Sequence, residues 1–177
     1  MARQATLLTR LSRTSVPKSW RSHAKRHIFY YVSPLFYGLS GLLMGYVEAG
    51  KPHAIPLEPV VWVMQTILTY MSDVHTLGED SRWHAADRLH AYTFTIVRAL
   101  ITSYVWWRMA AYTTLQMTIF FVGLVLSLVC IRMSWLSIRA RSVRAFLFWH
   151  AMWHTGLPLT AVCIALLELA PSLSALR

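Results

Sequence analysis

The sequence predicts an all-α protein, a multi-pass transmembrane helical bundle of about five spans. Hydrophobic residues make up 56% of its 177 residues, whereas charged residues make up only 14%. Five long apolar runs approach the roughly 20 residues that a helix needs to cross a bilayer core of about 30 Å. Helices satisfy their own backbone hydrogen bonds, which is what allows them to cross lipid. The distribution of basic residues fits the same number of spans.

The five spans follow one another through most of the chain. The first contains Gly41 and Gly45, a small-xxx-small pair that lets another helix approach closely. Cys130 and Cys163 lie within the fourth and fifth spans, where they fit small apolar packing residues rather than a disulfide framework. The predicted spans are residues 28–47, 59–75, 87–107, 114–133 and 145–169.

Basic residues collect on one side of this topology. The N-terminus and the second and fourth loops share that side, which holds 13 of the 17 Lys and Arg residues. The positive-inside rule therefore places the N-terminus in the cytoplasm, the mitochondrial matrix or the plastid stroma. The formal net charge of +10 requires no nucleic acid, because anionic lipid headgroups and acidic partners attract the same charge. The basic residues on this side are Arg3, Arg10, Arg13, Lys18, Arg21, Lys25, Arg26, Arg82, Arg88, Arg132, Arg139, Arg141 and Arg144.

The chain divides into a basic N-terminal arm (1–27), one transmembrane bundle (28–170) and a short C-terminal tail (171–177). The arm has no acidic residue and is rich in Arg and Ser, a composition typical of a mitochondrial or plastid transit peptide. The same composition fits a basic arm that lies on anionic lipid. A secretory signal would need a continuous apolar core, which the arm lacks.

Arg98 lies near the centre of the third span. An arginine at that depth costs about 2.5–3.5 kcal/mol on insertion scales, so its guanidinium must face a carboxylate, backbone carbonyls, a lipid phosphate, a cofactor or water. A structural ion pair or carbonyl clamp is favoured over recognition of an anion or a quinone, because structural clamps are commoner. No carboxylate in the chain has a clearly matching predicted depth, so we expect the contact partner of Arg98 in another subunit.

Polar residues gather between the second and third spans, and histidines recur at the start of the fifth. His150 and His154 are four residues apart, so one helix face carries both, and two imidazoles at this spacing can bind one metal ion. The order of the spans places His75, Asp87 and His150 on the same side of the membrane. The sequence therefore predicts a His-Asp-His-His cluster at one membrane face.

This pattern resembles the signature of a superfamily that contains the alkaline ceramidases, the adiponectin-receptor-like proteins and the hemolysin-III-like proteins. That signature is a Ser-x3-His at the end of an early span, an Asp about a dozen residues later, and a His-x3-His in the last span. Ser72 and His75 are similar to the first element and Asp87 to the second. His150 and His154 are similar to the third. The chain departs from the family in the spacing of Ser72 and His75, which are three residues apart, and in having five spans rather than seven.

The resemblance implies a zinc ion held by His75, His150 and His154, with catalytic roles for Ser72 and Asp87. Asp87 would accept a proton from water, Ser72 would stabilise a developing oxyanion, and the substrate would be an amide in a lipid. Other interpretations remain open. The histidines also fit interfacial polar residues, contacts to lipid, or ligands of haem or chlorophyll, and Asp87 fits a helix N-cap.

Two functions follow from these features. Small size, a transit-like arm and Arg98 favour an accessory subunit of a large energy-transducing membrane complex, such as the mitochondrial respiratory chain or an ATP synthase assembly. We then expect the mitochondrial inner membrane, with the N-terminus in the matrix, and as partners other membrane subunits and anionic lipids such as cardiolipin. The alternative is a ceramidase-like zinc-dependent lipid amidohydrolase, either active or recruited into such a complex as an inactive relic.

Overall fold

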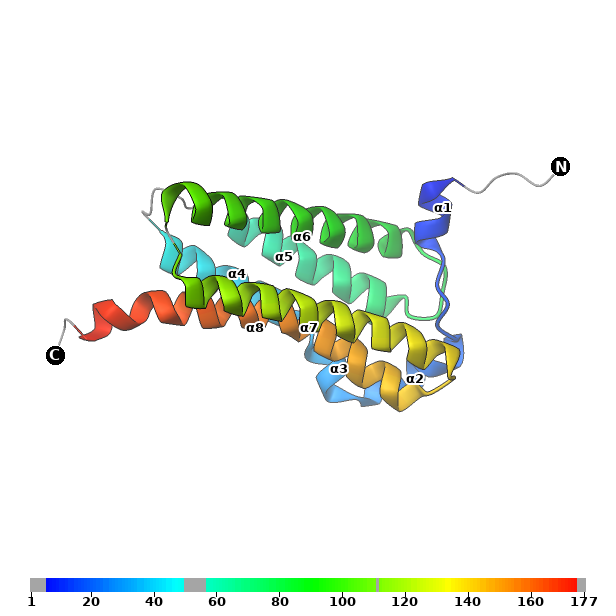
Figure 1. The fold of residues 1–177 in the computed structure, drawn as a ribbon. Helices are drawn as coiled ribbons and strands as arrows, with labels where there is room; N and C mark the ends of the chain where they lie inside the picture. Colours follow the sequence, from blue (N-terminus) through cyan, green and yellow to red (C-terminus); the bar gives the residue numbers. More distant parts are fainter. Residues whose placement is uncertain (1–5, 50–56, 111, 175–177) are drawn as a thin grey trace.

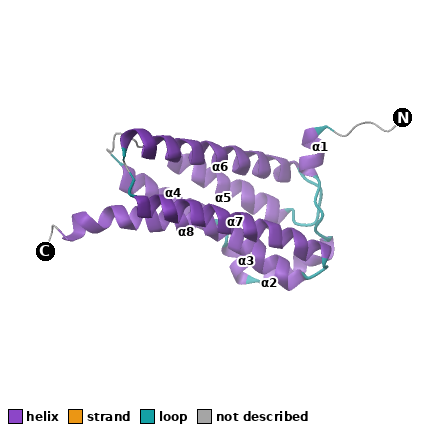
Figure 2. Ribbon diagram, viewed as in Figure 1, coloured by secondary structure: helices purple, strands orange, loops and turns teal. Residues whose placement is uncertain are grey.

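A computed structural model describes residues 6–49, 57–110 and 112–174, and every element in these ranges is helical. The bundle has five helical rods, which are α3 with α4, α5 with the π-helical turn that follows it, α6, α7 and α8. The rods run side by side, and α1 and α2 lie at one end of the bundle (Figures 1 and 2). The first five residues of the predicted arm and the last three of the predicted tail lie outside the described ranges. The elements are α1 (Leu7–Ser12), a 3₁₀ turn (Lys18–Trp20), α2 (Arg21–Arg26), α3 (Ile28–Val32), α4 (Leu35–Glu48), α5 (Glu58–Thr69), a π-helical turn (Tyr70–His75), α6 (Arg82–Met109), α7 (Thr114–Arg139) and α8 (Val143–Ser174).

The first rod is broken near one end, where α3 stops and α4 begins. The break falls at Pro34, because proline has no N–H with which to continue the helical hydrogen bonds. Beyond the break, α4 packs closely on α5. A Cβ atom added at Gly41 would lie 2.2 Å from the Cβ of Trp62, and one at Gly45 would lie 2.5 Å from the Cγ of Pro59. The two glycines therefore permit the close helix approach that the sequence predicts.

The second rod changes its winding before it ends. α5 continues directly into the π-helical turn, in which the amide of Thr76 donates to the carbonyl of Met71, five residues earlier, at 3.0 Å. Such a turn holds one more residue than an α-helical turn and is often found at functional sites. The Tyr30 hydroxyl donates to the carbonyl of Asp73 at 3.0 Å, which fixes the turn against α3.

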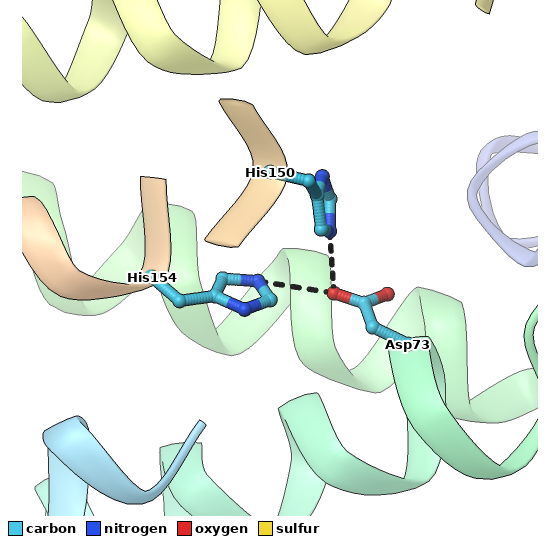
Figure 3. Close-up of side chains that lie close together, drawn as sticks. All are labelled: Asp73, His150 and His154. Atoms are coloured by element: carbon cyan, nitrogen blue, oxygen red, sulfur yellow. Dashed lines mark hydrogen bonds and ion pairs between the residues drawn. The ribbon is translucent and has the colours of Figure 1, made fainter. Parts of the chain in front are cut away.

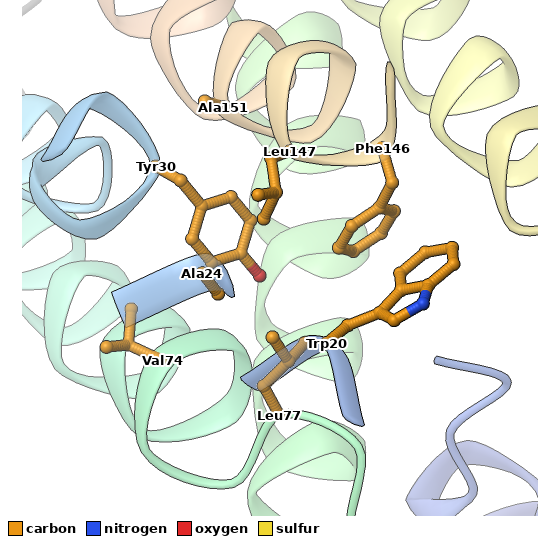
Figure 4. Packing of buried hydrophobic residues seen from close by; sticks show 8 residues of the cluster. All are labelled: Trp20, Ala24, Tyr30, Val74, Leu77, Phe146, Leu147 and Ala151. Carbon is orange, nitrogen blue, oxygen red and sulfur yellow. The ribbon is translucent and has the colours of Figure 1, made fainter. Parts of the chain in front are cut away.

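Defined caps bound the third and fourth rods. Ser81 accepts a hydrogen bond from the amide of Trp83 at the start of α6, which ends at Ala110 in a left-handed conformation. Thr113 and Gln116 form a capping box at the start of α7. α7 and α8 make the most extensive helix contact in the described bundle, and the largest core cluster lies where α8 meets the π-helical turn and the N-terminal arm (Figure 4).

The N-terminal arm folds onto the bundle rather than extending from it. The indole of Trp20 is buried against Phe146 and Leu77 (Figure 4). Lys18 and Arg21 each form an ion pair with Glu79 at 3.0 Å, in the loop between the π-helical turn and α6. The described part of the predicted transit-like segment is therefore an integral part of this fold.

Within the described ranges, two helices are long and apolar enough to cross a membrane, namely α7 and the part of α8 from Val143 to Leu169. Only 28% of the apolar window of each is buried inside the bundle, so most of their apolar surface faces outward. The other three rods correspond to predicted spans in position but do not meet the same criterion. α4 and α5 have only 14 and 12 residues, and α6 carries several charged residues along its length.

Candidate metal centre

Three side chains meet between the π-helical turn and α8. Asp73 Oδ2 lies 2.8 Å from His150 Nε2 and 3.1 Å from His154 Nε2 (Figure 3). The exposed fractions of the Asp73, His150 and His154 side chains are 14%, 18% and 3%. One ligand atom from each residue falls within 4.8 Å of the other two. A single cation could therefore contact all three.

Helix geometry explains how the two imidazoles meet. His150 and His154 are one turn apart on α8 and point to the same side, with ring centroids 4.6 Å apart. The Phe146 ring stacks on the His150 ring at 5.0 Å, and the Tyr37 ring lies 5.9 Å from that of His154. These aromatic neighbours limit the rotation of both imidazoles.

A buried serine determines which nitrogen of His154 carries the proton. The Ser33 hydroxyl donates to the carbonyl of Tyr30 at 2.9 Å and lies 3.1 Å from His154 Nδ1. A hydroxyl has one proton and a carbonyl only accepts, so Ser33 accepts from the Nδ1–H of His154. In a neutral His154 the lone pair of Nε2 then faces the carboxylate of Asp73. This contact is repulsive unless a proton or a metal cation lies between the two atoms.

A second serine contacts Nδ1 of His150. Ser134 on α7 is buried, and its Oγ lies 3.0 Å from His150 Nδ1. Each imidazole therefore has Nδ1 fixed by a serine hydroxyl and Nε2 directed at Asp73. Ligands of metal ions commonly have their second ring nitrogen fixed by such a hydrogen bond, which sets the tautomer and the ring orientation.

The other oxygen of Asp73 belongs to a buried hydrogen-bond chain. Ser72 Oγ lies 2.8 Å from Asp73 Oδ1 and 2.7 Å from His84 Nδ1. His84 Nε2 lies 2.9 Å from the carbonyl of Glu79, to which it can only donate. This chain holds the carboxylate of Asp73 from behind, and Ser72 and His84 are both almost fully buried.

Asp87 lies near this centre in a separate polar group. Its Oδ1 accepts from Thr69 Oγ1 and from Gln65 Nε2, each at 2.7 Å. The amide oxygen of Gln65 lies 2.6 Å from His90 Nδ1. The carboxyl of Asp87 is thus held through one oxygen by residues of α5, and Asp87 does not cap its own helix, because Ser81 does so.

A cavity of about 390 Å³ joins these two groups. Its lining includes the buried or half-buried Asp73, His84, Asp87 and His150. Residues of the N-terminal arm, among them the exposed Arg10 and Arg13, and further residues of α6, α7 and α8 complete the wall. A small polar molecule in the cavity would have access to the carboxylates of Asp73 and Asp87 and to the imidazole of His150.

The structure brings together only some of the residues that the sequence predicts for the site. His150 and His154 meet as expected, and Asp87 lines the same cavity. His75 is exposed at the end of the π-helical turn, and it does not belong to the group of possible metal ligands among the described residues. Ser72 lies behind Asp73, with its hydroxyl engaged by Asp73 and His84. The predicted oxyanion role of Ser72 and the predicted ligand role of His75 therefore have no support in this geometry.

Sequence reasoning missed Asp73, His84, Ser33 and Ser134. Asp73 and His75 are two residues apart, about 200° around an α-helix, so they cannot both face the same neighbour. Their position alone does not say which of them faces α8. For Ser33, a polar residue inside a predicted apolar span was the available signal, whereas Ser134 directly follows the predicted fourth span.

Arg98 has a carboxylate partner within the chain. Its Nη1 lies 3.0 Å from Glu58 Oε2, and Glu58 is only 3% exposed. The expectation that Arg98 pairs with another subunit is therefore wrong. It failed because Glu58 was placed outside the second span, whereas it is the first residue of α5 and is buried between helices.

No family model, curated protein or solved structure matches this chain. The kind of metal can be inferred from the three ligand atoms. Two imidazole nitrogens and one carboxylate oxygen form a ligand set found in catalytic zinc sites, which leave a further position open for water or substrate. The fixed Nδ1–H of His154 leaves its Nε2 free to bind a metal, so the residues present fit zinc.

Proposed function

We propose that this protein is a membrane-embedded, metal-dependent hydrolase whose zinc ion is held by Asp73, His150 and His154. The observation that carries the proposal is the orientation of His154. Its Nδ1–H is committed to Ser33, so its Nε2 presents a lone pair to Asp73 Oδ2 at 3.1 Å. A divalent cation would remove the repulsion and bond to both atoms.

The surrounding residues fit hydrolysis. A bound zinc ion would polarise a carbonyl and make water more acidic at neutral pH. Asp87 lines the same cavity, so we assign it the role of accepting a proton from water. Ser72 and His84 hold the carboxylate of Asp73, and Ser33 and Ser134 hold the imidazoles. The aromatic ring of Phe146, stacked on His150, limits access of water from that side.

A lipid amide is the substrate class that we favour. A second cavity has a largely apolar lining that includes Met44, Phe94 and Ile164, and it shares Ala91 and Trp153 with the cavity at the metal centre. The apolar cavity has a volume of about 60 Å³, which suits only the end of an acyl chain, so the rest of the chain and its polar linkage would lie toward the larger cavity and Asp73. Of the residues that carry the resemblance to the alkaline ceramidases, Asp87, His150 and His154 keep their roles in this proposal, whereas Ser72 and His75 do not.

A membrane location of all five rods belongs to this proposal. Large apolar side chains are exposed along the three rods that do not meet the length and apolarity criterion, as they are along α7 and α8. A soluble protein rarely exposes apolar surface over so many helices, whereas lipid would cover it. These side chains include Leu39, Leu42, Val60, Ile67, Ile96 and Leu100.

Metal analysis of the purified protein tests the proposal. We expect about one zinc ion per chain, lost in the double variant H150A/H154A and in Asp73→Asn. His23→Ala is the matched control, because His23 is exposed on α2 and lies outside the centre. The purified wild type should also release fatty acid from an N-acyl lipid, and Asp87→Asn should not. Absence of zinc from the wild type, or zinc retained by H150A/H154A, would reject the proposal.

The accessory-subunit interpretation remains a prediction with less support than before. It rested partly on Arg98, whose guanidinium pairs with Glu58 inside the chain. Small size and the basic arm still agree with it, and a location in the mitochondrial inner membrane is part of the same prediction. Native electrophoresis of gently solubilised membranes would test it, since a subunit migrates far above the mass of one chain.

A further inference from the structure

We infer that the mouth of the cavity at the metal centre is a binding subsite for a phosphate group, formed by Arg10, Arg13 and Arg88. The inference rests on the proposed function and deepens it, since it assigns the substrate to the lipids that carry a phosphate beside their polar linkage. Arg10, Arg13 and Arg88 line the same cavity as Asp73, Asp87 and His150.

The fold brings these arginines together from two distant segments. Arg10 and Arg13 belong to the N-terminal arm, whereas Arg88 lies in the second turn of α6. Arg88 Nη1 donates to the carbonyls of Leu11 at 2.6 Å and of Arg13 at 2.9 Å. The arm is therefore held against α6 at Arg13 and at Leu11, which lies between Arg10 and Arg13 in the sequence.

Two further hydrogen bonds fix the arm at this position. The amide of Ser81 donates to the carbonyl of Ser12 at 2.9 Å, and the amide of Thr14 donates to Asp80 Oδ1 at 2.9 Å. The backbone on both sides of Arg13 is thus tied to the loop before α6. A basic segment that served only as a diffuse attractor of lipid would need no such fixed backbone.

The side chains of Arg10 and Arg13 are exposed and can turn to a ligand, whereas Arg88 is half-buried and its Nη1 holds the arm. Among the described residues, the Lys and Arg side chains in ion pairs with carboxylates are Lys18, Arg21 and Arg98, and none of these is an arginine of the cavity lining. The nearby Asp80 accepts the backbone amide of Thr14. Guanidinium groups bind phosphate oxygens through paired hydrogen bonds, and several of them around one opening suit a phosphate better than a carboxylate.

The order of charges along the cavity orients such a ligand. Asp73 and Asp87 are half-buried and would repel a phosphate, whereas the exposed Arg10 and Arg13 would attract it at the mouth. The phosphate would then stay outside, its neighbouring polar linkage would reach the metal centre, and an acyl chain would enter the apolar cavity. A membrane phospholipid and a soluble phosphate ester share this phosphate chemistry.

The test is a binding measurement on the full chain in a neutral detergent. Two probes separate the sources of phosphate: sn-glycerol 3-phosphate, which has no acyl chain, and dioleoyl phosphatidic acid in mixed micelles. The variant R10Q/R13Q removes two charges from the mouth and leaves Arg88 to hold the arm. The matched control is R141Q/R144Q, which removes two exposed charges from the predicted same side of the membrane, outside the cavity lining.

We expect R10Q/R13Q to weaken binding of phosphatidic acid about tenfold or more, as the loss of charge-assisted hydrogen bonds implies, while R141Q/R144Q binds like the wild type. Competition by glycerol phosphate would identify the phosphate alone as the ligand, and binding of phosphatidic acid alone would identify a lipid. Equal losses in the two double variants would overturn the inference, because they would indicate general surface attraction. No binding of either probe to the wild type would overturn it as well.

Zinc analysis of the same samples separates this inference from the proposed function. R10Q/R13Q should keep the zinc content of the wild type, because neither arginine contacts Asp73, His150 or His154. If the wild type contains no zinc, the hydrolase proposal fails, and the binding data still decide whether the phosphate subsite exists.

Discussion

Glu58 and Arg98 form a buried ion pair that joins the first turn of α5 to the middle of α6, with 3.0 Å between Glu58 Oε2 and Arg98 Nη1. The indole N–H of Trp62 donates to the other oxygen of Glu58 at 3.0 Å. The pair gives an arginine deep in an apolar helix a partner of opposite charge, and it links α6, which lines the cavity at the metal centre, to α5, whose Gln65 and Thr69 hold Asp87.

Removing one member of this pair should destabilise the fold strongly. Glu58→Gln or Arg98→Met breaks a buried ion pair and removes only one of its two charges, so we expect the free energy of unfolding to fall by about 3–5 kcal/mol in either variant. The double variant E58Q/R98M should lose much less than the sum of the two, because neither charge remains. Unfolding in detergent measures the three values, with Arg108→Met, exposed at the end of α6, as control. Additive losses would contradict a direct pair.

The hydroxyl of Ser33 should tune the affinity for zinc. Ser33→Ala frees the Nδ1 of His154, so its Nε2 is no longer the preferred ligand atom, and we expect zinc affinity to fall about 10–100-fold. Competition titration with a zinc-binding dye measures this change. Ser127→Ala is a matched control on α7, because Ser127 is equally buried and its hydroxyl has no hydrogen-bond partner among the described residues. Equal affinities in the two variants would show that Ser33 has no role in the centre.

Two glycines on α4 should respond differently to alanine. A Cβ at Gly41 would lie 2.2 Å from the Cβ of Trp62, whereas the nearest atom to a Cβ at Gly38 is Thr66 Oγ1 at 3.0 Å. Overpacking at Gly41 should lower the free energy of unfolding by about 1–3 kcal/mol more than the same change at Gly38. The gain in helix propensity is shared by both variants and cancels in the comparison. Similar unfolding curves would mean that α4 and α5 are not in close contact at Gly41.

Acid should loosen the N-terminal arm from the loop before α6. The Lys18 ammonium, through a hydrogen bond and its charge, holds the pKa of Glu79 below its ordinary value of 4.5. A lowered carboxyl pKa stabilises the docked arm above pH 4.5, and this contribution is lost as the pH falls through the lower, folded-state value. A nitroxide attached at Ser15, with Cys130 and Cys163 replaced by alanine, should become more mobile in that range.

Glu79→Gln provides the comparison for this measurement. The variant should show a more mobile arm at neutral pH and no further change in the acidic window that belongs to Glu79. An arm that stays equally immobile in both proteins at every pH would show that Lys18 and Glu79 do not hold it.

The sequence predicts the helices of this fold better than it predicts their contacts. The apolar runs mark all five rods, and the spacing of His150 and His154 is enough to place both on one face of α8. Pairing between helices is harder, because it depends on the relative depth of residues far apart in the chain. Glu58 and Arg98 illustrate this limit, since a shift of one residue at the predicted start of the second span placed Glu58 outside it.

The metal centre shows a second limit. Ser33 and Ser134 each contact one ring nitrogen of a histidine, and no local sequence pattern predicts such a contact between distant residues. Asp73 was not predicted as a ligand, because Ser72 and His75 on either side of it fit a known motif. Only the path of the backbone decides which of these side chains faces α8.

Which residues form the metal centre depends on the number of residues in the π-helical turn as well as on their identity. Deleting Met71 would turn this segment into an ordinary α-helix and rotate the following side chains by about 100° relative to α5. Asp73 would leave the two imidazoles although every ligand residue remained in the chain. Relatives that differ from this protein by one inserted or deleted residue here would therefore present a different side chain to the same pair of histidines, so a motif aligned by spacing alone assigns the ligand incorrectly in this segment.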